Sequence, residues 1–298
     1  MPLRLNISST LLRKINPGRE GFLTKIINVL RKQPLLTASI GILFAVGGTK
    51  LLHHDGYFAM GVHRYVLALA MCVFLVLISG KKTFKKCEKT TGYVLKWSIG
   101  IFVLAGVLCR LGLLGAFSEG KQIAKDWPIQ TLLLLFAITG VGLFEELAFR
   151  AVLSDGIIYQ FRNKKWVFAV SAIVGSLLFG YVHVMSDDAS TPIALAQIIM
   201  KTVSTGLWGM TLLFLYWKTR NIWACGIAHG IYDFILMVKD VLFVGEGEKG
   251  VSYVHEGFLG GVSIGIYVVE TVVMIIILLI LWKKVIKNID FEEMRKNW

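Results

Sequence analysis

The sequence predicts an all-α membrane protein, a polytopic helical bundle of about eight transmembrane helices. Hydrophobic residues make up 55% of the 298 and charged residues 17%, with a mean hydropathy of +0.67, which is far from the usual values of a soluble domain. Apolar windows long enough to cross a bilayer recur along the chain. The net charge of +13 comes from short basic clusters between these windows, which suits anionic lipid headgroups better than nucleic acid.

Eight windows of mostly apolar residues follow one another without a long linker. In order, they cover 35–52, 61–79, 93–117, 129–153, 166–185, 192–216, 222–243 and 258–282. If the N-terminus is cytoplasmic, the segments on the inner side hold 22 Lys and Arg and the loops on the outer side hold 3. This bias follows the positive-inside rule, so we expect both termini in the cytoplasm of a cell, with the protein in the cell membrane.

The expected organisation is one domain with two flanking segments. Residues 1–34 form a basic segment on the inner leaflet, 35–285 form the eight-span domain with a motif core at 125–245, and 286–298 form a cytoplasmic tail. Small residues in GILFAVGG, SAIVGSLLFG and FLGGVSIG allow close helix packing. The cysteines are too widely separated for a disulfide framework or a thiolate zinc site; they are Cys72, Cys87, Cys109 and Cys225.

The fourth window carries three charged residues, Glu145, Glu146 and Arg150. Each charge near the bilayer centre costs about 2.5–3.5 kcal/mol on insertion scales, so together they indicate a functional site. On an α-helix Glu146 and Arg150 share one face, whereas Glu145 points about 100° away from Glu146. We therefore expect a structural Glu146–Arg150 ion pair and a separate Glu145 that can act as a base.

Two other windows each add a pair of residues one helical turn apart. Phe179 and His183 end the fifth window, and His229 and Asp233 lie in the seventh. Imidazole and carboxylate groups together can activate water, and a further donor can stabilise an oxyanion, which suits hydrolysis. The same side chains could also form a zinc or di-iron site, although HExxH and ExxH motifs are absent.

The depth of these residues in the membrane sets a condition on the fold. His229 lies near the inner start of its window and His183 near the outer end of its own, a difference of about 15 Å along a helix. The groups can meet if the fourth helix continues to about residue 161 and the fifth starts below the membrane surface, with tilt bringing in His229.

Several other charged residues lie in or near the windows. Most, including Lys50, Arg64 and Lys201, are close enough to a window end to extend to the surface. Arg110 and Glu270 could instead pair across the bundle. None of these residues is expected in the site.

Three patterns resemble the CAAX-protease and bacteriocin-processing family of intramembrane proteases, which includes the Ras-converting CAAX endopeptidase. They are EExxxR at 145–150, FxxxH at 179–183 and HxxxD at 229–233. The resemblance implies an endopeptidase in which Glu145 and His183 activate water while His229 and Asp233 assist the oxyanion. Because an ionised aspartate repels an oxyanion, Asp233 is either protonated or orients His229. The aspartate and the short loops resemble bacterial members.

The resemblance also sets expectations for cofactors and partners. Glu146, Arg150 and Phe179 would support the site, and no cofactor is required; if zinc is present, its ligands would be Glu145, His183 and His229. The expected partners are membrane lipids and a peptide or lipid-modified protein reached from the cytoplasmic side, with no nucleic acid. Two alternatives stay open: a non-catalytic scaffold or bacteriocin self-immunity protein, and a proton-coupled transporter, for which no inverted repeat is seen.

Overall fold

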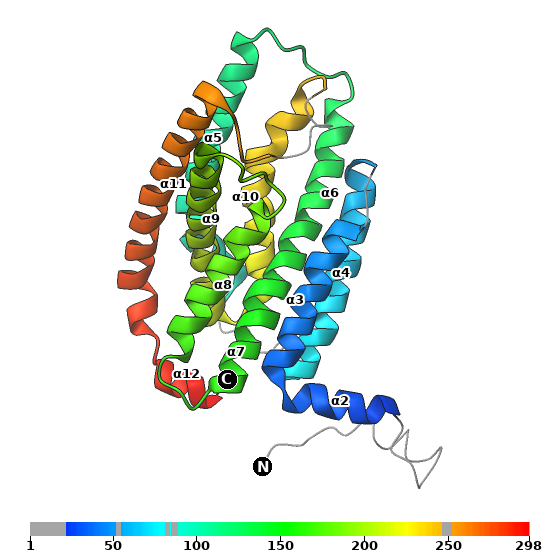
Figure 1. The fold of residues 1–298 in the computed structure, drawn as a ribbon, viewed down its shortest axis with the longest axis vertical. Helices are drawn as coiled ribbons and strands as arrows, with labels where there is room; N and C mark the ends of the chain where they lie inside the picture. Colours follow the sequence, from blue (N-terminus) through cyan, green and yellow to red (C-terminus); the bar gives the residue numbers. More distant parts are fainter. Residues whose placement is uncertain (1–21, 52–54, 81–83, 85–88, 246–251, 298) are drawn as a thin grey trace.

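The chain forms a bundle of long helices in a computed structural model that describes residues 22–51, 55–80, 84, 89–245 and 252–297 (Figure 1). In chain order the elements are α2 (Phe22–Lys32), α3 (Pro34–Leu51), α4 (Gly56–Ser79), α5 (Thr91–Ser118), α6 (Trp127–Glu145), η2 (Glu146–Leu153), α7 (Ser154–Phe161), α8 (Val167–Val184), α9 (Pro192–Thr219), α10 (Ile222–Leu242), α11 (Gly257–Lys284), η3 (Ile286–Asn288) and α12 (Phe291–Asn297).

Eight of the described helical segments are long and apolar enough to cross a membrane, so the predicted helical bundle is confirmed. The fourth segment runs without a break from Trp127 to Phe161, as the depth of the polar residues requires. Large apolar side chains on the outside of α5 and α11, such as Val103, Val269 and Ile276, are exposed as in a lipid-facing surface.

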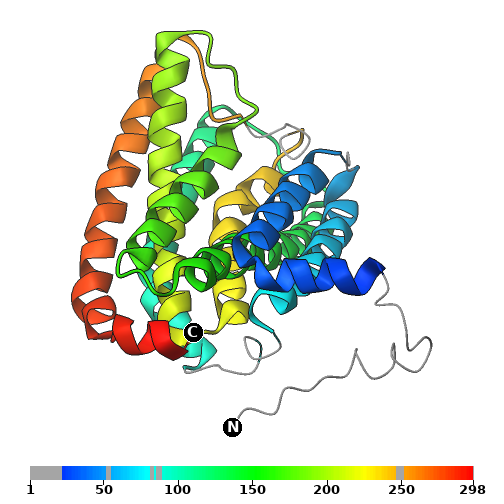
Figure 2. The same ribbon diagram turned by 60° about the horizontal axis from the view of Figure 1, so that its bottom comes forward.

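The first and last described helices, α2 and α12, lie at the same end of the bundle (Figures 1 and 2). We call this the α2–α12 end. α2 lies across the end of the bundle. It exposes the apolar Phe22 and Leu23 and carries the basic Lys25, a combination that is expected for a helix at a lipid surface. The predicted N-terminal segment also includes residues 1–21, which lie outside the described residues. α12 packs back onto the bundle, since the ring of Phe291 lies 5.0 Å from that of Phe168.

The helix formed by α6, η2 and α7 is the centre of the fold. Within it, Glu146–Leu153 is π-helical, and all eight residues of this stretch are buried. A π-helix closes its hydrogen bonds over five residues, so it is wider than an α-helix, and such segments occur often at functional sites. The predicted α-helix is therefore replaced by a π-helix from the second of the two glutamates onward.

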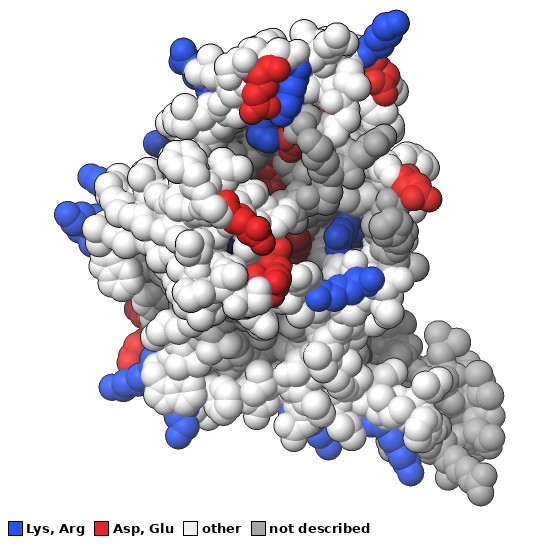
Figure 3. All heavy atoms as spheres, turned by 45° about the horizontal axis from the view of Figure 1, so that its top comes forward, with Lys and Arg blue, Asp and Glu red and all other residues white. Residues whose placement is uncertain are grey.

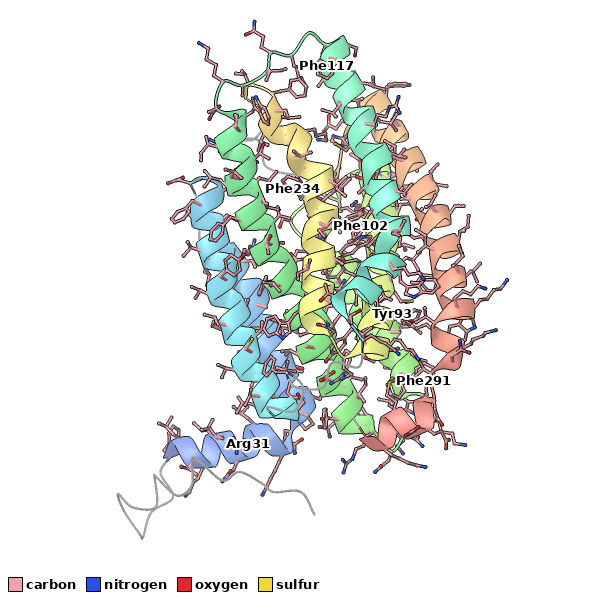
Figure 4. All side chains as sticks on the ribbon, turned by 180° about the vertical axis from the view of Figure 1, so that it is seen from behind. Arg31, Tyr93, Phe102, Phe117, Phe234 and Phe291 are labelled. Carbon is pink, nitrogen blue, oxygen red and sulfur yellow. The ribbon has the colours of Figure 1, made fainter. Side chains whose placement is uncertain are left out.

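α10 lies between α6 and α5; in the view from behind, Phe234 labels α10 and Phe102 labels α5 (Figure 4). Glycines bring α6 and α10 together: a Cβ on Gly142 would lie 2.5 Å from the carbonyl oxygen of Gly226 and 2.7 Å from the nitrogen of Gly230. Since both atoms are backbone, no side chain could move aside. The two helices approach closely here because neither carries a side chain at this contact.

A buried ion pair sets the level of α10 relative to the central helix. Arg220 lies in the two-residue turn between α9 and α10 with a φ of 49°, and Asn221 caps α10 by accepting from the Ala224 nitrogen at 3.1 Å. The Arg220 guanidinium donates to both oxygens of Asp155, at 3.2 and 3.1 Å. Burial acts to lower the pKa of Arg220, but the charge of Asp155 outweighs it and raises this pKa, so the pair stays ionised.

The position of the Asp155–Arg220 ion pair along the helices explains how the polar residues meet. Glu145 precedes Asp155 by ten residues, and His229 follows Arg220 by nine, so both lie about the same distance along their helices from the ion pair. Glu145 and His183 likewise lie sixteen residues from Phe161 and from Val167, the two sides of the α7–α8 turn. These equal spacings place Glu145, His183 and His229 at a common level in the bundle.

Candidate active site

The structure brings Glu145, His183, His229 and Asp233 together near the middle of the bundle. Oε2 of Glu145 lies 3.8 Å from Nε2 of His183 and 3.7 Å from Nε2 of His229. Oδ2 of Asp233 lies 3.2 Å from the same His229 nitrogen. These side chains come from α6, α8 and α10, so the site exists only when the three helices are packed.

Glu146 and Arg150 form the expected ion pair, with 3.3 Å between Nε of Arg150 and Oε2 of Glu146. The structure adds a contact that the sequence did not predict: Nδ1 of His229 lies 2.9 Å from Oε1 of Glu146. Glu146 therefore neutralises Arg150 and also holds the ring of His229. A hydrogen bond from an imidazole to a carboxylate fixes both the orientation and the protonated nitrogen of the ring.

An aromatic wall supports these charged groups. The Arg150 guanidinium lies 3.9 Å from the centre of the Phe179 ring, a cation–π contact that accounts for the aromatic residue of the FxxxH pattern. Trp208 of α9, which the sequence analysis missed, packs its ring 4.5 Å from that of His229 and 5.8 Å from that of Phe179. Its only signal in the sequence is a tryptophan inside a membrane span, away from the interface where tryptophan is common.

Exposure divides the charged side chains into two groups. Glu145, His183 and Asp233 have 18%, 23% and 21% of their side-chain surface accessible, whereas Glu146 is fully buried and Arg150 nearly so. A cavity of about 160 Å³ borders Glu145 and His183 of the first group. Its lining consists of Ala45, Val46, Thr49, Lys50, Arg64, Phe144, Glu145, Phe149, Val182, His183 and Met185.

Part of the cavity lining is remote from the α2–α12 end. Thr49 and Lys50 belong to the last turn of α3, and Met185 follows the end of α8. On the face turned forward in Figure 3, acidic and basic side chains surround a recess in an otherwise largely uncharged surface.

Hydrogen bonding assigns different roles to the two imidazoles. Nδ1 of His183 lies 2.8 Å from the carbonyl oxygen of Phe179, which can only accept, so Nδ1 carries a proton and Nε2 is left for Glu145 or a water. His229 faces carboxylate oxygens with both ring nitrogens, which suits the imidazolium form with two N–H donors. Oε2 of Glu145 is buried and has no hydrogen-bond partner among the described residues.

The candidate zinc ligands are arranged in a way that neither requires nor forbids a metal. Glu145, His183 and His229 face one another through the ring nitrogens and the oxygen that zinc would use, and both histidines have a partner at Nδ1 as metal ligands usually do. Within the described part of the chain, however, no group of three His, Cys, Asp or Glu side chains is arranged closely enough to hold a metal ion as it stands.

Tyr253, in the described part of the loop before α11, lies near the site. Lys201 lies 4.8 Å from the ring centre of Tyr253 in this loop and 3.7 Å from Glu270. Burial, followed by the negative charges of Asp233 and Glu145, raises the pKa of Tyr253. The suggested pairing of Glu270 with Arg110 is wrong: Glu270 contacts Lys201 and Ser204, while Arg110 is exposed. Lys201 likewise points inward and not to the surface.

Comparison with known proteins shows which family the chain resembles. Residues 127–235 match the family model of the type II CAAX prenyl endopeptidase Rce1-like proteins. A protein of Bacillus subtilis (strain 168), named "Putative membrane peptidase YdiL", is 25% identical over 204 residues, which cover 64% of this chain and 74% of that protein. No solved structure matches the chain. The resemblance predicted from the three motifs is therefore confirmed: over residues 127–235, which include every candidate catalytic residue, this multi-pass membrane protein is similar to the Rce1-like family of CAAX prenyl endopeptidases.

Proposed function

We propose that this protein is an intramembrane endopeptidase that hydrolyses a peptide bond in a peptide or lipid-modified protein. The family match and the name of the Bacillus relative support a membrane peptidase. The observation that carries the proposal is Oε2 of Glu145, a carboxylate oxygen that has no hydrogen-bond partner among the described residues and faces two imidazole nitrogens at 3.7 and 3.8 Å beside a cavity. Both separations are too long for direct hydrogen bonds, so these groups keep hydrogen-bonding capacity for a water.

Glu145 acts as the general base in this mechanism. A water between Glu145 and His183 donates one hydrogen to the carboxylate and the other to Nε2 of His183. As the water attacks the peptide carbonyl, Glu145 takes its proton, and the new carbon–oxygen bond leaves a tetrahedral oxyanion. Glu145 then passes the proton to the leaving amine when the carbon–nitrogen bond breaks, so the products are one acid and one amine.

In the proposed mechanism His229 stabilises the oxyanion. Its Nδ1–H is held by Glu146, and its Nε2–H, which faces Asp233 at 3.2 Å, donates to the oxyanion as it forms. Asp233 orients the ring through this nitrogen. Arg150 neutralises Glu146 and Phe179 covers Arg150, so these residues maintain the site without touching the substrate.

The test is cleavage of a quenched-fluorescent peptide library by purified protein in lipid nanodiscs. Glu145→Gln keeps the shape but cannot take a proton, so we expect kcat to fall by about 10²–10⁴-fold with the unfolding temperature little changed. The matched control is Glu119→Gln, at a glutamate whose side chain is 63% exposed and lies outside the site. Equal activity of wild type and Glu145→Gln would remove Glu145 as the base.

The same preparations separate the metal-free mechanism from a zinc-dependent one. Under the proposal, activity persists after dialysis against a chelator, and the metal content is below one equivalent per chain. One equivalent of zinc that is lost in both Glu145→Gln and His183→Ala would instead make these residues ligands. A folded protein that cleaves no peptide under any condition would favour the non-catalytic scaffold.

A further inference from the structure

Arg64 lines the cavity next to Glu145 and His183, although it was expected to extend to the membrane surface. Its Nε and Nη1 atoms are buried and have no hydrogen-bond partner among the described residues. Within the same part of the chain, no carboxylate forms an ion pair with this guanidinium. An arginine keeps its charge in proteins, so Arg64 places a positive charge with unused donors in the cavity wall.

The position of Arg64 is fixed by its packing against α6. A Cβ on Gly140 would lie 3.2 Å from Cβ of Arg64, so the glycine makes room for the arginine stem. The guanidinium lies 5.5 Å from the ring centre of Phe144, the residue before Glu145. These contacts with Gly140 and Phe144 hold Arg64 at the level of the proposed base, Glu145. A lysine or arginine that extends to the surface would not need them.

A buried hydrogen-bond donor without a partner costs free energy, unless a bound ligand supplies the partner. Arg150, the other arginine near the site, is paired with Glu146 and covered by Phe179. Arg64 differs because it lines the cavity, whose other walls are mostly apolar and include Ala45, Val46 and Val182. The combination of a cation and apolar walls suits a ligand with an anionic group next to a hydrophobic one.

We propose that Arg64 binds a carboxylate of the peptide substrate and so sets which peptide bond lies at Glu145; the inference rests on the proposed peptidase function. The fork of guanidinium donors matches a planar carboxylate. The cavity of about 160 Å³ is smaller than the usual 300–1,000 Å³ of ligand pockets, so it takes one part of a peptide. The carboxylate is either the C-terminus of the peptide or an acidic side chain near the cleaved bond.

Binding of matched peptides to the inactive Glu145→Gln protein tests this proposal without cleavage. One fluorescent peptide is made with a C-terminal acid and with a C-terminal amide, and a second pair carries Glu or Gln near its middle. We expect the preferred acid form to bind about ten- to a hundredfold more tightly than its neutral partner, as measured by anisotropy in nanodiscs. The pair that shows the preference identifies the source of the carboxylate.

Adding Arg64→Gln to the Glu145→Gln protein should abolish the preference. Arg64→Lys should keep only part of it, because lysine retains the charge without the fork. The matched control is Arg110→Gln, which removes an exposed arginine from a membrane span and should leave the preference intact. If Arg64→Gln does not fold, Arg64→Lys provides the comparison, since it differs from wild type in geometry and not in charge.

Two results would overturn the proposal. One is equal binding of the acid and neutral peptides. The other is a preference for the acid peptide that survives Arg64→Gln. Either result would leave Arg64 only the role of a positive charge near Glu145. Neither result bears on hydrolysis, which wild-type cleavage tests separately. A preference that depends on Arg64 in a protein that cleaves no peptide would instead support the carboxylate site and contradict the peptidase function.

Discussion

Glu145 and Glu146 are adjacent in the sequence and yet contact different partners. Glu146 is fully buried, pairs with Arg150 and holds Nδ1 of His229, whereas Glu145 is partly exposed beside a cavity. The 100° rotation between neighbours on a helix predicts this separation. It does not predict that Glu146 reaches a histidine on α10, because that contact depends on how two helices pack.

The two histidines should respond differently to removal. His183→Ala removes a side chain that is 23% exposed and is hydrogen-bonded only within its own helix, so we expect loss of peptide cleavage with little change in unfolding temperature. His229→Ala removes the buried partner of Glu146 and leaves that carboxylate poorly satisfied. We therefore expect it to lose cleavage and also to destabilise the protein by about 1–3 kcal/mol.

Thermal unfolding in nanodiscs, measured beside the cleavage assay, checks this contrast. The informative control is Arg110→Gln, an exposed change that should alter neither quantity. Equal destabilisation by the two histidine variants would mean that the Glu146–His229 hydrogen bond contributes little to the fold. Retained cleavage in His183→Ala would remove this residue from water activation.

At the scale of elements, the site depends on close contact between α6 and α10. The glycines Gly142, Gly226 and Gly230 allow the two backbones to approach, and this places His229 against Glu146 at the start of the π-helix. Small residues have the same role here as in the stretches noted in the sequence. Residues 225–230, CGIAHG, thus supply both the candidate catalytic side chain of His229 and the packing surface that positions it.

Gly142→Ala tests this dependence. The added methyl would lie 2.5 Å from a backbone oxygen of α10, so the helices must separate. We expect overpacking to destabilise the protein by about 1–3 kcal/mol and to reduce cleavage by moving His229 from Glu145. The matched control is Gly106→Ala in α5, where a methyl meets no atom within 4 Å and should favour the helix. Full activity in Gly142→Ala would show that the spacing is not critical.

For the whole molecule, orientation decides which compartment would supply the proposed peptide substrate. α2 and α12 lie at one end of the bundle, and part of the cavity lining, Thr49, Lys50 and Met185, lies toward the other. The distribution of 22 and 3 basic residues predicts a cytoplasmic α2–α12 end. Under that orientation, we expect the proposed substrate to approach Glu145 from outside the cell or from the outer leaflet.

Cysteine labelling in intact cells measures the orientation. In a background with all four native cysteines replaced by alanine, Lys125→Cys lies in the exposed loop before α6 and Lys296→Cys lies in α12. We expect a membrane-impermeant maleimide to label position 125 in intact cells and position 296 only after the cells are permeabilised. The reverse pattern would place both described ends outside and the cavity on the cytoplasmic side.

The sequence by itself determined the membrane bundle, the number of spans and the candidate residues. These depend on local properties, since hydropathy and charge along a segment decide whether it enters a bilayer, and helical spacing decides which neighbours share a face. The motifs at 145–150, 179–183 and 229–233 could be read in the same way. None of these patterns contains information on the relative level of two helices.

Only the tertiary structure decided how the residues meet. The Asp155–Arg220 ion pair sets the level of α10, the π-helix sets the direction of Glu146, and packing on Gly140 brings Arg64 to the cavity. Each depends on contacts between segments that are distant in the chain. A span can slide or rotate by one turn without changing its hydropathy, and the buried pairs select a single arrangement because any other leaves their charges unpaired in an apolar interior.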